Sequence, residues 1–348
     1  MFHTMKIIPR CLSIRHINTL CIVIMTLFYS LCITSNCIGE VFRKDISLMG
    51  TDVEIIAAAK DNRIFTAAFD AAVMEMKRIE GEMSEWKQET LISEINMMAG
   101  NKPVKVSDEL FNVISAAQKI ADISDGAFDI SWACMRGLWN FTDGKNIVPA
   151  REEIEQRLKF VNYRDIMLDE NKKTVFLKRK GMAIGLGGIA KGYAVDKAMQ
   201  VLVSHGIKDA VIKAGGDTRV QGAKQGEAWE IGIKHPRDKA RHFLTLELSN
   251  ISISTSGDYE RFFIKDNVLY HHIMDPKTGY PAKHSQSVTI LAPDTMTSDA
   301  LSTAVFVLGH VKGMELIKKL PGIEGIIIDS TGKAHYSNGF EKSGLTKK

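Results

Sequence analysis

The sequence predicts an α+β fold, in which a single domain is built of mainly antiparallel sheet with flanking helices. Three observations lead to this prediction. After residue 210 the chain is rich in short apolar runs separated by turn residues, which favours antiparallel sheet. Before that point, three longer segments carry apolar residues at helical spacing. The 348 residues, 45% of them hydrophobic, can bury a sizeable core, and they show no repeats, low-complexity linker or sharp domain boundary.

The first 39 residues predict a secretory signal peptide or an N-terminal anchor. A basic stretch up to Arg15 precedes a mostly apolar run at 20–33, and small or polar residues follow as far as Gly39. The apolar run is short for a membrane span, so cleavage after Gly39 is favoured over a retained anchor or a lipid on Cys37. We therefore expect an exported protein, in the periplasm or anchored to the outer face of the cytoplasmic membrane.

The charge and the cysteines narrow the class of protein further. The net charge is +4, and the first 39 residues supply three of these positive charges and no acid, which leaves +1 for the remainder. A nearly neutral body gives no electrostatic case for nucleic acid, although the N-terminus could reach a membrane surface. Four of the five cysteines also lie in this segment. Cys134 alone remains, so we expect no disulfide framework and a buried, hydrophobic Cys134.

The body begins with a strand–turn–strand unit and two helices. Residues 41–58 are extended on both sides of a turn at 49–51. Apolar residues then recur at helical spacing over 65–79, and Gly81 is expected to end that helix. A second helix is predicted at 107–124, because a capping serine is followed by two acids in the first turn.

The remaining elements follow the same two patterns up to residue 340, and we expect 341–348 to be a flexible tail. A polar loop at 140–156 leads into a short helix, and residues 163–184 predict a β-hairpin. Helices are expected at 189–205, 297–308 and 311–319, and strands at 210–214, 229–233, 243–248, 251–254, 261–264, 287–291 and 325–329.

The most informative motif is a glycine-rich stretch from Ala183 to Asp196. Its four glycines free the backbone for positive φ and for close approach of a ligand, and a helix begins directly after them. Such a turn before a helix N-terminus favours anions, and Lys191 adds a positive charge, so the motif predicts a phosphate cradle. Two alternatives are a dinucleotide-binding fingerprint at 185–190 and a plain packed turn. The antiparallel pattern after residue 210 weighs against the fingerprint.

A carboxylate and a hydroxyl lie one turn apart on the helix predicted at 297–308. Asp299 and Thr303 project from the same face of that helix. Carboxylate and hydroxyl oxygens suit Mg²⁺ better than zinc. The alternative is that Asp299 only stabilises the helix dipole.

Two histidines and one tryptophan complete the candidates. His271 and His272 end an extended segment, so one of the two can enter a site and accept a proton, while a structural role is the alternative. Zinc ligation by the pair is not expected, because the spacing is wrong. Trp86 follows the first helix at a turn, where it either packs in the core or stacks on a planar ring.

Seven motifs in this order resemble those of the ApbE family of FAD:protein FMN transferases, over residues 41–335. They are Met49-Gly-Thr51, Gly126-Ala-Phe-Asp129, Gly187-Gly-Ile-Ala-Lys-Gly-Tyr-Ala-Val-Asp196, Gly215-Gly-Asp217, Thr255-Ser-Gly-Asp-Tyr259, His272-Ile-Met-Asp-Pro276 with Thr278-Gly279, and Asp299 with Thr303.

The resemblance implies a T-fold-related, ApbE-like catalytic domain over residues 40–340. Members of this family transfer the FMN half of FAD to a threonine or serine hydroxyl of a partner protein; AMP leaves and Mg²⁺ is required. The partner is typically a flavoprotein subunit of an exported or membrane redox complex.

The resemblance also assigns roles to individual residues. It implies that Asp299, Thr303 and the backbone carbonyl of Gly188 bind the metal and that His272 is the catalytic base, with Asp299 as the second catalytic residue. The FAD contacts that it implies are Met49, Trp86, Ala127, Phe128, Asp129, Lys191 and Ile273. One position departs from the family pattern: Gly185 stands where many members have an aspartate in the nucleotide site, so one expected FAD contact is missing.

Two other functions stay open at this point. In a magnesium-dependent FAD pyrophosphatase, water would replace the acceptor hydroxyl and the products would be free FMN and AMP. An exported flavin-binding protein would have no turnover.

Overall fold

The computed structural model describes residues 39–141, 144–342 and 346–347, and Gly39–Lys348 form one compact unit. The predicted signal peptide or anchor lies outside the described residues. Within them, one helix, Thr295–Lys319, is long and apolar enough to cross a membrane, but 61% of its most apolar window is buried inside the fold. That burial is typical of a core helix.

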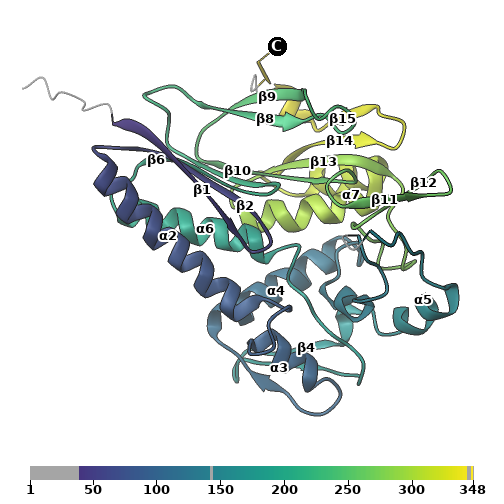
Figure 1. Ribbon diagram of the computed structural model, residues 1–348. Coiled ribbons are helices and arrows are strands. Elements are labelled where there is room, and N and C mark those ends of the chain that lie inside the picture. The colour runs from purple at the N-terminus through teal and green to yellow at the C-terminus, as the bar shows by residue number, and fades with distance from the viewer. Residues whose placement is uncertain (1–38, 142–143, 343–345, 348) are drawn as a thin grey trace, which may run out of the picture. The chain divides into compact units, whose positions relative to one another are not determined.

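An eight-stranded sheet forms the centre of this unit, and every neighbouring pair of its strands is antiparallel (Figure 1). In spatial order the strands are β1 (Glu40–Leu48), β2 (Thr51–Ala59), β6 (Asp209–Ala214), β7 (Asp217–Gln221), β10 (Ile251–Gly257), β13 (Ser285–Ala292), β14 (Glu324–Asp329) and β15 (Ala334–Tyr336). The predicted α+β class with mainly antiparallel sheet is confirmed.

Helices cover one face of this sheet and a small second sheet covers the other (Figure 1). The helices are α2 (Asn62–Met83), α6 (Ala190–Ser204) and α7 (Thr295–Lys319). The second sheet contains β8 (Trp229–Lys234), β9 (His242–Leu248) and β16 (Thr346–Lys347), and its apolar residues share a core cluster with those of the central sheet. The sheet is therefore buried on both faces, which explains its continuous apolar runs.

The segment between α2 and α6 forms a separate layer beside the helices. It contains α3 (Leu91–Met97), α4 (Asp108–Ile123), α5 (Arg151–Leu158), two 3₁₀ turns at Ile130–Met135 and Tyr163–Asp165, and a sheet of β3 (Val104–Lys105), β5 (Thr174–Leu177) and β4 (Ile166–Asp169). A β-hairpin of β11 (Phe262–Lys265) and β12 (Val268–His271) and a short α8 (Asn338–Lys342) complete the described residues.

Two predictions about helix ends have different outcomes. Gly81 does not end the first helix, which continues to Met83. A single glycine costs a helix about 1 kcal/mol, and burial of Ile79 and Met83 in the core outweighs that cost. The predicted break between 308 and 311 is confirmed, because Gly309 takes φ +73° and kinks α7.

Strands β7 and β15 were not predicted, since each is short and lies directly after a turn.

Cys134 is buried as predicted, and burial raises the pKa of its thiol to about 12. It is a free cysteine, so no disulfide holds the described part of the chain together.

Candidate active site

The turn between β1 and β2 meets the end of the β11–β12 hairpin. Met49 and Gly50 have φ of +54° and +68°, the pair of values that a two-residue hairpin turn requires. The Arg261 guanidinium donates to the Gly50 carbonyl at 3.0 Å, and the His272 amide donates to the Arg261 carbonyl at 3.1 Å. Arg261, to which the sequence assigned no role, thus joins the turn that contains the predicted FAD residue Met49 to the predicted base His272.

The turn between β6 and β7 brings Asp217 to the same place. Gly215 has φ +62° and its amide donates to the Asp52 carbonyl at 3.0 Å. Gly216 lies so close to β10 that an added Cβ would overlap the Thr255 carbonyl oxygen. Both glycines are therefore required by backbone geometry, and the tight turn starts β7 with a buried Asp217.

The N-terminus of α6 points at two buried acids. The Lys191 ammonium lies 2.6 Å from Asp217 Oδ2 and 3.6 Å from Asp299 Oδ2, and the Gly192 amide donates to Asp299 Oδ2 at 3.1 Å. The phosphate-binding groups predicted at this turn are thus partly used by the protein's own carboxylates. A further contact of Lys191 with FAD remains a prediction.

Burial and mutual charge set the protonation of this trio. Burial and the neighbouring Asp217 charge raise the pKa of Asp299 to about 7, against the effects of Lys191 and the Gly192 amide. Burial opposes the charge on Lys191, but the two acids outweigh it and raise the pKa of Lys191. A site with two close acids and one ammonium favours an additional cation, because that cation would relieve the repulsion between the carboxylates.

Close packing of α6 on α7 holds Asp299 in place. A Cβ on Gly192 would overlap the Thr295 carbonyl oxygen and lie 2.9 Å from Asp299 Cβ, so the two helices touch at this glycine. Asp196, one turn later on α6, accepts hydrogen bonds from the Thr295 and Met296 amides at 2.9 Å. Asp294 is the N-cap residue of α7, and Asp196 accepts two further amides of its first turn, which ties the start of α7 to α6.

Three hydroxyl pairs hold α7 against β10. The oxygens of Ser252, Ser254 and Ser256 lie 2.8 Å from hydroxyl oxygens of Thr295, Ser298 and Ser302, respectively. The strand serines recur every second residue and so share one face. This pattern is visible in the sequence, although it was not used there, and it orients the face of α7 that carries Asp299 and Thr303.

Gly188 lies next to Thr303, which follows Asp299 by one turn of α7. Thr303 Oγ1 is 3.4 Å from Ser256 Oγ, and a Cβ placed on Gly188 would lie 3.7 Å from Thr303 Oγ1. That Cβ would also come within 3.1 Å of the Phe128 ring, so a glycine suits this position. A carboxylate, a hydroxyl and a backbone carbonyl are hard ligands, and the residues fit Mg²⁺.

The two adjacent histidines have different surroundings. His271 is buried, its Nε2 donates to the Ala282 carbonyl at 2.8 Å, and its Nδ1 accepts the Ile273 amide at 3.2 Å. Both ring nitrogens are used, so His271 is a structural, neutral histidine. His272 is the histidine with an accessible ring, and its Nδ1 lies 3.3 Å from the Arg261 carbonyl oxygen.

His272 is neutral at physiological pH. Although part of the ring is open to solvent, surrounding protein atoms bury much of it, and this burial, with His271 and Arg261 nearby, lowers the pKa of His272 to about 4. A neutral imidazole can accept a proton, as a general base must.

Ala127, Phe128, Asp129 and Ile273 are also predicted to contact FAD, but the Asp129 carboxylate already has partners within the fold. Ala127 and Ile273 are buried in a common apolar cluster, and Phe128 packs against Gly188. The Asp129 carboxylate is buried and accepts hydrogen bonds from Ser131 and from the Tyr163 amide, so its oxygens are used within the fold. Contacts between this segment and FAD remain predictions.

Trp86 does not pack in the core. Its side chain is 75% exposed, and the Arg136 guanidinium lies 4.6 Å from the centre of its ring. Beside it, Glu85 occupies the space next to Gly185: a Cβ at that glycine would lie 2.7 Å from Glu85 Oε1. A carboxylate thus lies next to the position where the sequence lacks an aspartate, which the sequence alone did not show.

Comparison with known proteins places this site in a family. The family model described as "ApbE family" matches residues 49–327. The chain belongs to the ApbE family. It is 32% identical over 290 residues to the FAD:protein FMN transferase of Treponema pallidum, covering 79% of this chain and 80% of that protein. The corresponding protein of Klebsiella pneumoniae is 31% identical over 292 residues, covering 83% and 90%.

Solved structures of ApbE proteins have the same fold. The ApbE protein of Thermotoga maritima superposes with a TM-score of 0.80 at 36% identity, covering 89% of this chain and 100% of that one. The flavin transferase ApbE of Vibrio cholerae gives a TM-score of 0.76 at 26% identity, covering 87% and 99%. The predicted ApbE resemblance is confirmed, and the chain is an enzyme of the transferase class.

Proposed function

We propose that this ApbE enzyme transfers the FMN part of FAD to a threonine or serine hydroxyl of an exported partner protein, in a reaction that depends on Mg²⁺ and releases AMP. The observation that supports the proposal is that Gly188 lies next to Thr303, one helical turn after the buried Asp299, while Lys191, which contacts Asp299, is also among the groups that lower the pKa of His272. Relatives with the same fold are named FAD:protein FMN transferases.

The acceptor hydroxyl attacks the flavin-side phosphorus of FAD. A new O–P bond forms, the P–O bond to AMP breaks, and the hydroxyl proton passes to His272 Nε2, since Nδ1 faces the Arg261 carbonyl. The expected contribution of such a base is about 10²–10⁴-fold in rate.

Asp299, Thr303 and the Gly188 carbonyl would hold Mg²⁺ near the pyrophosphate. When bound, the ion would offset the negative charge of the phosphates and of departing AMP. Lys191 contacts both acids and lowers the pKa of Asp299, which favours the ionised form that would bind the ion. Exposed Trp86 offers a ring face on which a planar group of FAD can stack.

The partner and the compartment belong to the same proposal. The predicted N-terminal signal places the enzyme outside the cytoplasmic membrane, in the periplasm or anchored to the membrane surface. The acceptor is then a flavoprotein subunit of an exported or membrane redox complex.

The accessibility of His272 favours one alternative. Water can reach a partly exposed base as readily as a protein hydroxyl can, and hydrolysis of FAD would then give FMN and AMP. This second candidate is a magnesium-dependent FAD pyrophosphatase.

One experiment separates the two. Purified full-length enzyme is incubated with FAD and Mg²⁺, with and without an exported candidate acceptor, and AMP release and the acceptor mass are followed. Transfer predicts a mass gain equal to FMN that is lost when the acceptor threonine is changed to alanine. Equal amounts of AMP and free FMN without acceptor would show hydrolysis, and no AMP in any mixture would contradict hydrolysis and transfer to the acceptor tested.

A further inference from the structure

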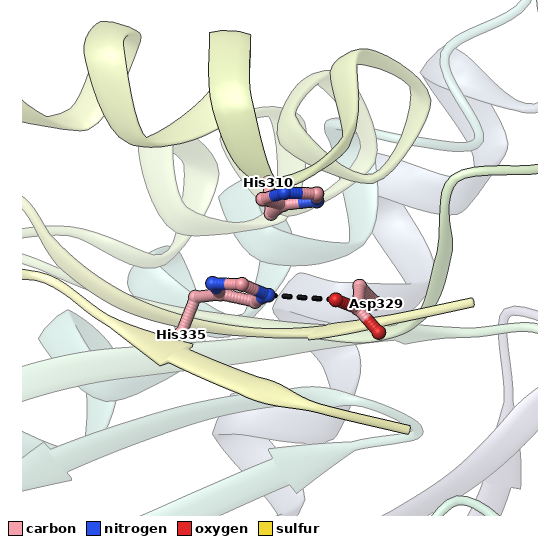
Figure 2. Close-up of side chains that lie close together, drawn as sticks. All are labelled: His310, Asp329 and His335. Carbon is pink, nitrogen blue, oxygen red and sulfur yellow. Dashed lines mark hydrogen bonds and ion pairs between the residues drawn. The ribbon is translucent and has the colours of Figure 1, made fainter. Parts of the chain in front are cut away.

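A second group of metal-ligating side chains lies outside the active site. His310, Asp329 and His335 come from α7, the end of β14 and β15, and each offers a ligand atom within 4.8 Å of the others (Figure 2). Asp329 is buried and both histidines are half-buried. His310 lies eleven positions after Asp299 on α7 and beyond the kink at Gly309, and the two groups share no residue.

The backbone holds these side chains at one place. Gly309, with φ +73°, breaks α7 just before His310. β14 and β15 pair in antiparallel orientation, and His335 on β15 lies opposite Ile327 on β14. The chain therefore turns back after Asp329 and brings His335 close to it. The turn between them is closed by hydrogen bonds between Asp329 and Lys333 in both directions.

The Asp329 carboxylate is fixed in orientation. Its Oδ1 accepts hydrogen bonds from the Thr331 amide at 2.9 Å, the Thr331 hydroxyl at 2.6 Å and the Lys333 amide at 3.1 Å. Its Oδ2 faces His335 Nε2 at 2.7 Å. In metal sites, a carboxylate that binds the ion is typically held in orientation by hydrogen bonds to its other oxygen.

The two histidine rings are stacked and nearly parallel. The ring centres lie 4.2 Å apart with an angle of 14° between the planes. Among the described residues, the His310 ring has this stacking contact and no hydrogen-bond partner. His310 also lines a hollow of about 370 Å³ that opens to solvent, although Asp329 and His335 do not line it.

We propose that His310, Asp329 and His335 bind a divalent transition-metal ion such as Zn²⁺. Two imidazoles and one carboxylate form a ligand set that suits zinc and its neighbours and does not suit Mg²⁺. The ion takes the place of the proton shared by His335 Nε2 and Asp329 Oδ2, and that proton moves to His335 Nδ1. A metal ion lies in the plane of each imidazole that binds it, so one of the two stacked rings must turn out of the stack before both can bind the same ion.

Such an ion would tie the second half of α7 to the β14–β15 pair at the edge of the central sheet. It is therefore a structural ion, and its binding adds stability to the folded state by mass action. FAD chemistry at Asp299 and His272 does not require it.

The test is calorimetric titration of Zn²⁺ into the purified full-length protein in the presence of excess Mg²⁺. We expect one Zn²⁺ per chain and a higher melting temperature with Zn²⁺. His310→Ala and His335→Ala should each weaken binding at least about a hundredfold, because loss of a supporting group alone costs 10–100-fold.

Two controls keep the result specific. His242→Ala removes an exposed histidine on β9, and Asp299→Ala removes the proposed Mg²⁺ ligand; both should bind Zn²⁺ as the unchanged protein does. Circular dichroism checks that each variant is folded, and Asp329→Asn offers a third variant if one histidine variant is not. Absence of stoichiometric binding, or equal binding by all folded variants, would overturn the proposal.

Discussion

Asp299 illustrates how one buried residue can be tested without disturbing its neighbours. Asp299→Asn keeps an oxygen for the Gly192 amide but loses the charge that a cation needs. We expect Mg²⁺-dependent AMP release to fall at least about a hundredfold, with an unchanged melting temperature within a few degrees. Asp294→Asn, at the cap of the same helix, is the matched control, because asparagine caps as well as aspartate. Full activity in Asp299→Asn would rule out the metal assignment.

The lowered pKa of His272 predicts that the rate of FMN transfer changes little at mildly acidic pH. With a pKa of about 4, the base is already neutral near pH 5.5, whereas an ordinary imidazole would be about nine-tenths protonated there. At saturating Mg²⁺, which keeps Asp299 ionised, single-turnover FMN transfer should therefore change less than about twofold between about pH 7.5 and about pH 5.5. A tenfold fall over this range that is absent in His272→Ala would contradict the lowered pKa.

The same residue also affects stability. Its pKa is lower in the folded than in the unfolded chain, so the unfolded chain binds more protons between about pH 6.5 and about pH 4. The stability from a neutral His272 is thus present above pH 6.5 and is lost as the pH falls through this range.

Among the helices and strands, the close contact between α6 and α7 holds Asp299 in its position in the site. Gly192→Ala would drive a methyl group into the Thr295 carbonyl and against Asp299, and we expect a loss of about 1–3 kcal/mol in the free energy of unfolding together with weaker Mg²⁺ binding. Urea denaturation and calorimetry measure the two effects.

Gly81→Ala is the matched control for this prediction. Gly81 lies inside α2 with no atom within 4 Å of an added Cβ, so alanine should stabilise the protein by about 0.5–1 kcal/mol. If both glycine variants changed stability alike, helix propensity and not helix contact would explain the result.

For the whole molecule, the core and the active site are separable. The apolar clusters lie between sheet and helices, and Lys191 offsets part of the charge of the two buried acids without a metal. Chelation with EDTA should therefore stop AMP release while far-UV circular dichroism stays unchanged, and Mg²⁺ alone should restore turnover. Loss of helical signal on chelation would show instead that a metal holds the fold together.

The sequence by itself determined the elements and the family. Apolar spacing and caps depend on local backbone periodicity, so α4, the β4–β5 hairpin and the kink at Gly309 could all be predicted. The order of short motifs was sufficient to indicate the ApbE family. It also singled out Asp299, Thr303 and Gly188 as metal ligands, which remains a prediction, and the structure places Gly188 next to Thr303.

Only the tertiary structure decided how those residues act on one another. Lys191 is 26 residues from Asp217, and Gly192 is 107 residues from Asp299, and no local pattern encodes their contacts. The same holds for the exposure of Trp86, the position of Glu85 beside Gly185, and the group of His310, Asp329 and His335. Local sequence fixes backbone conformation, whereas distances between distant side chains depend on strand pairing and helix packing across the whole domain.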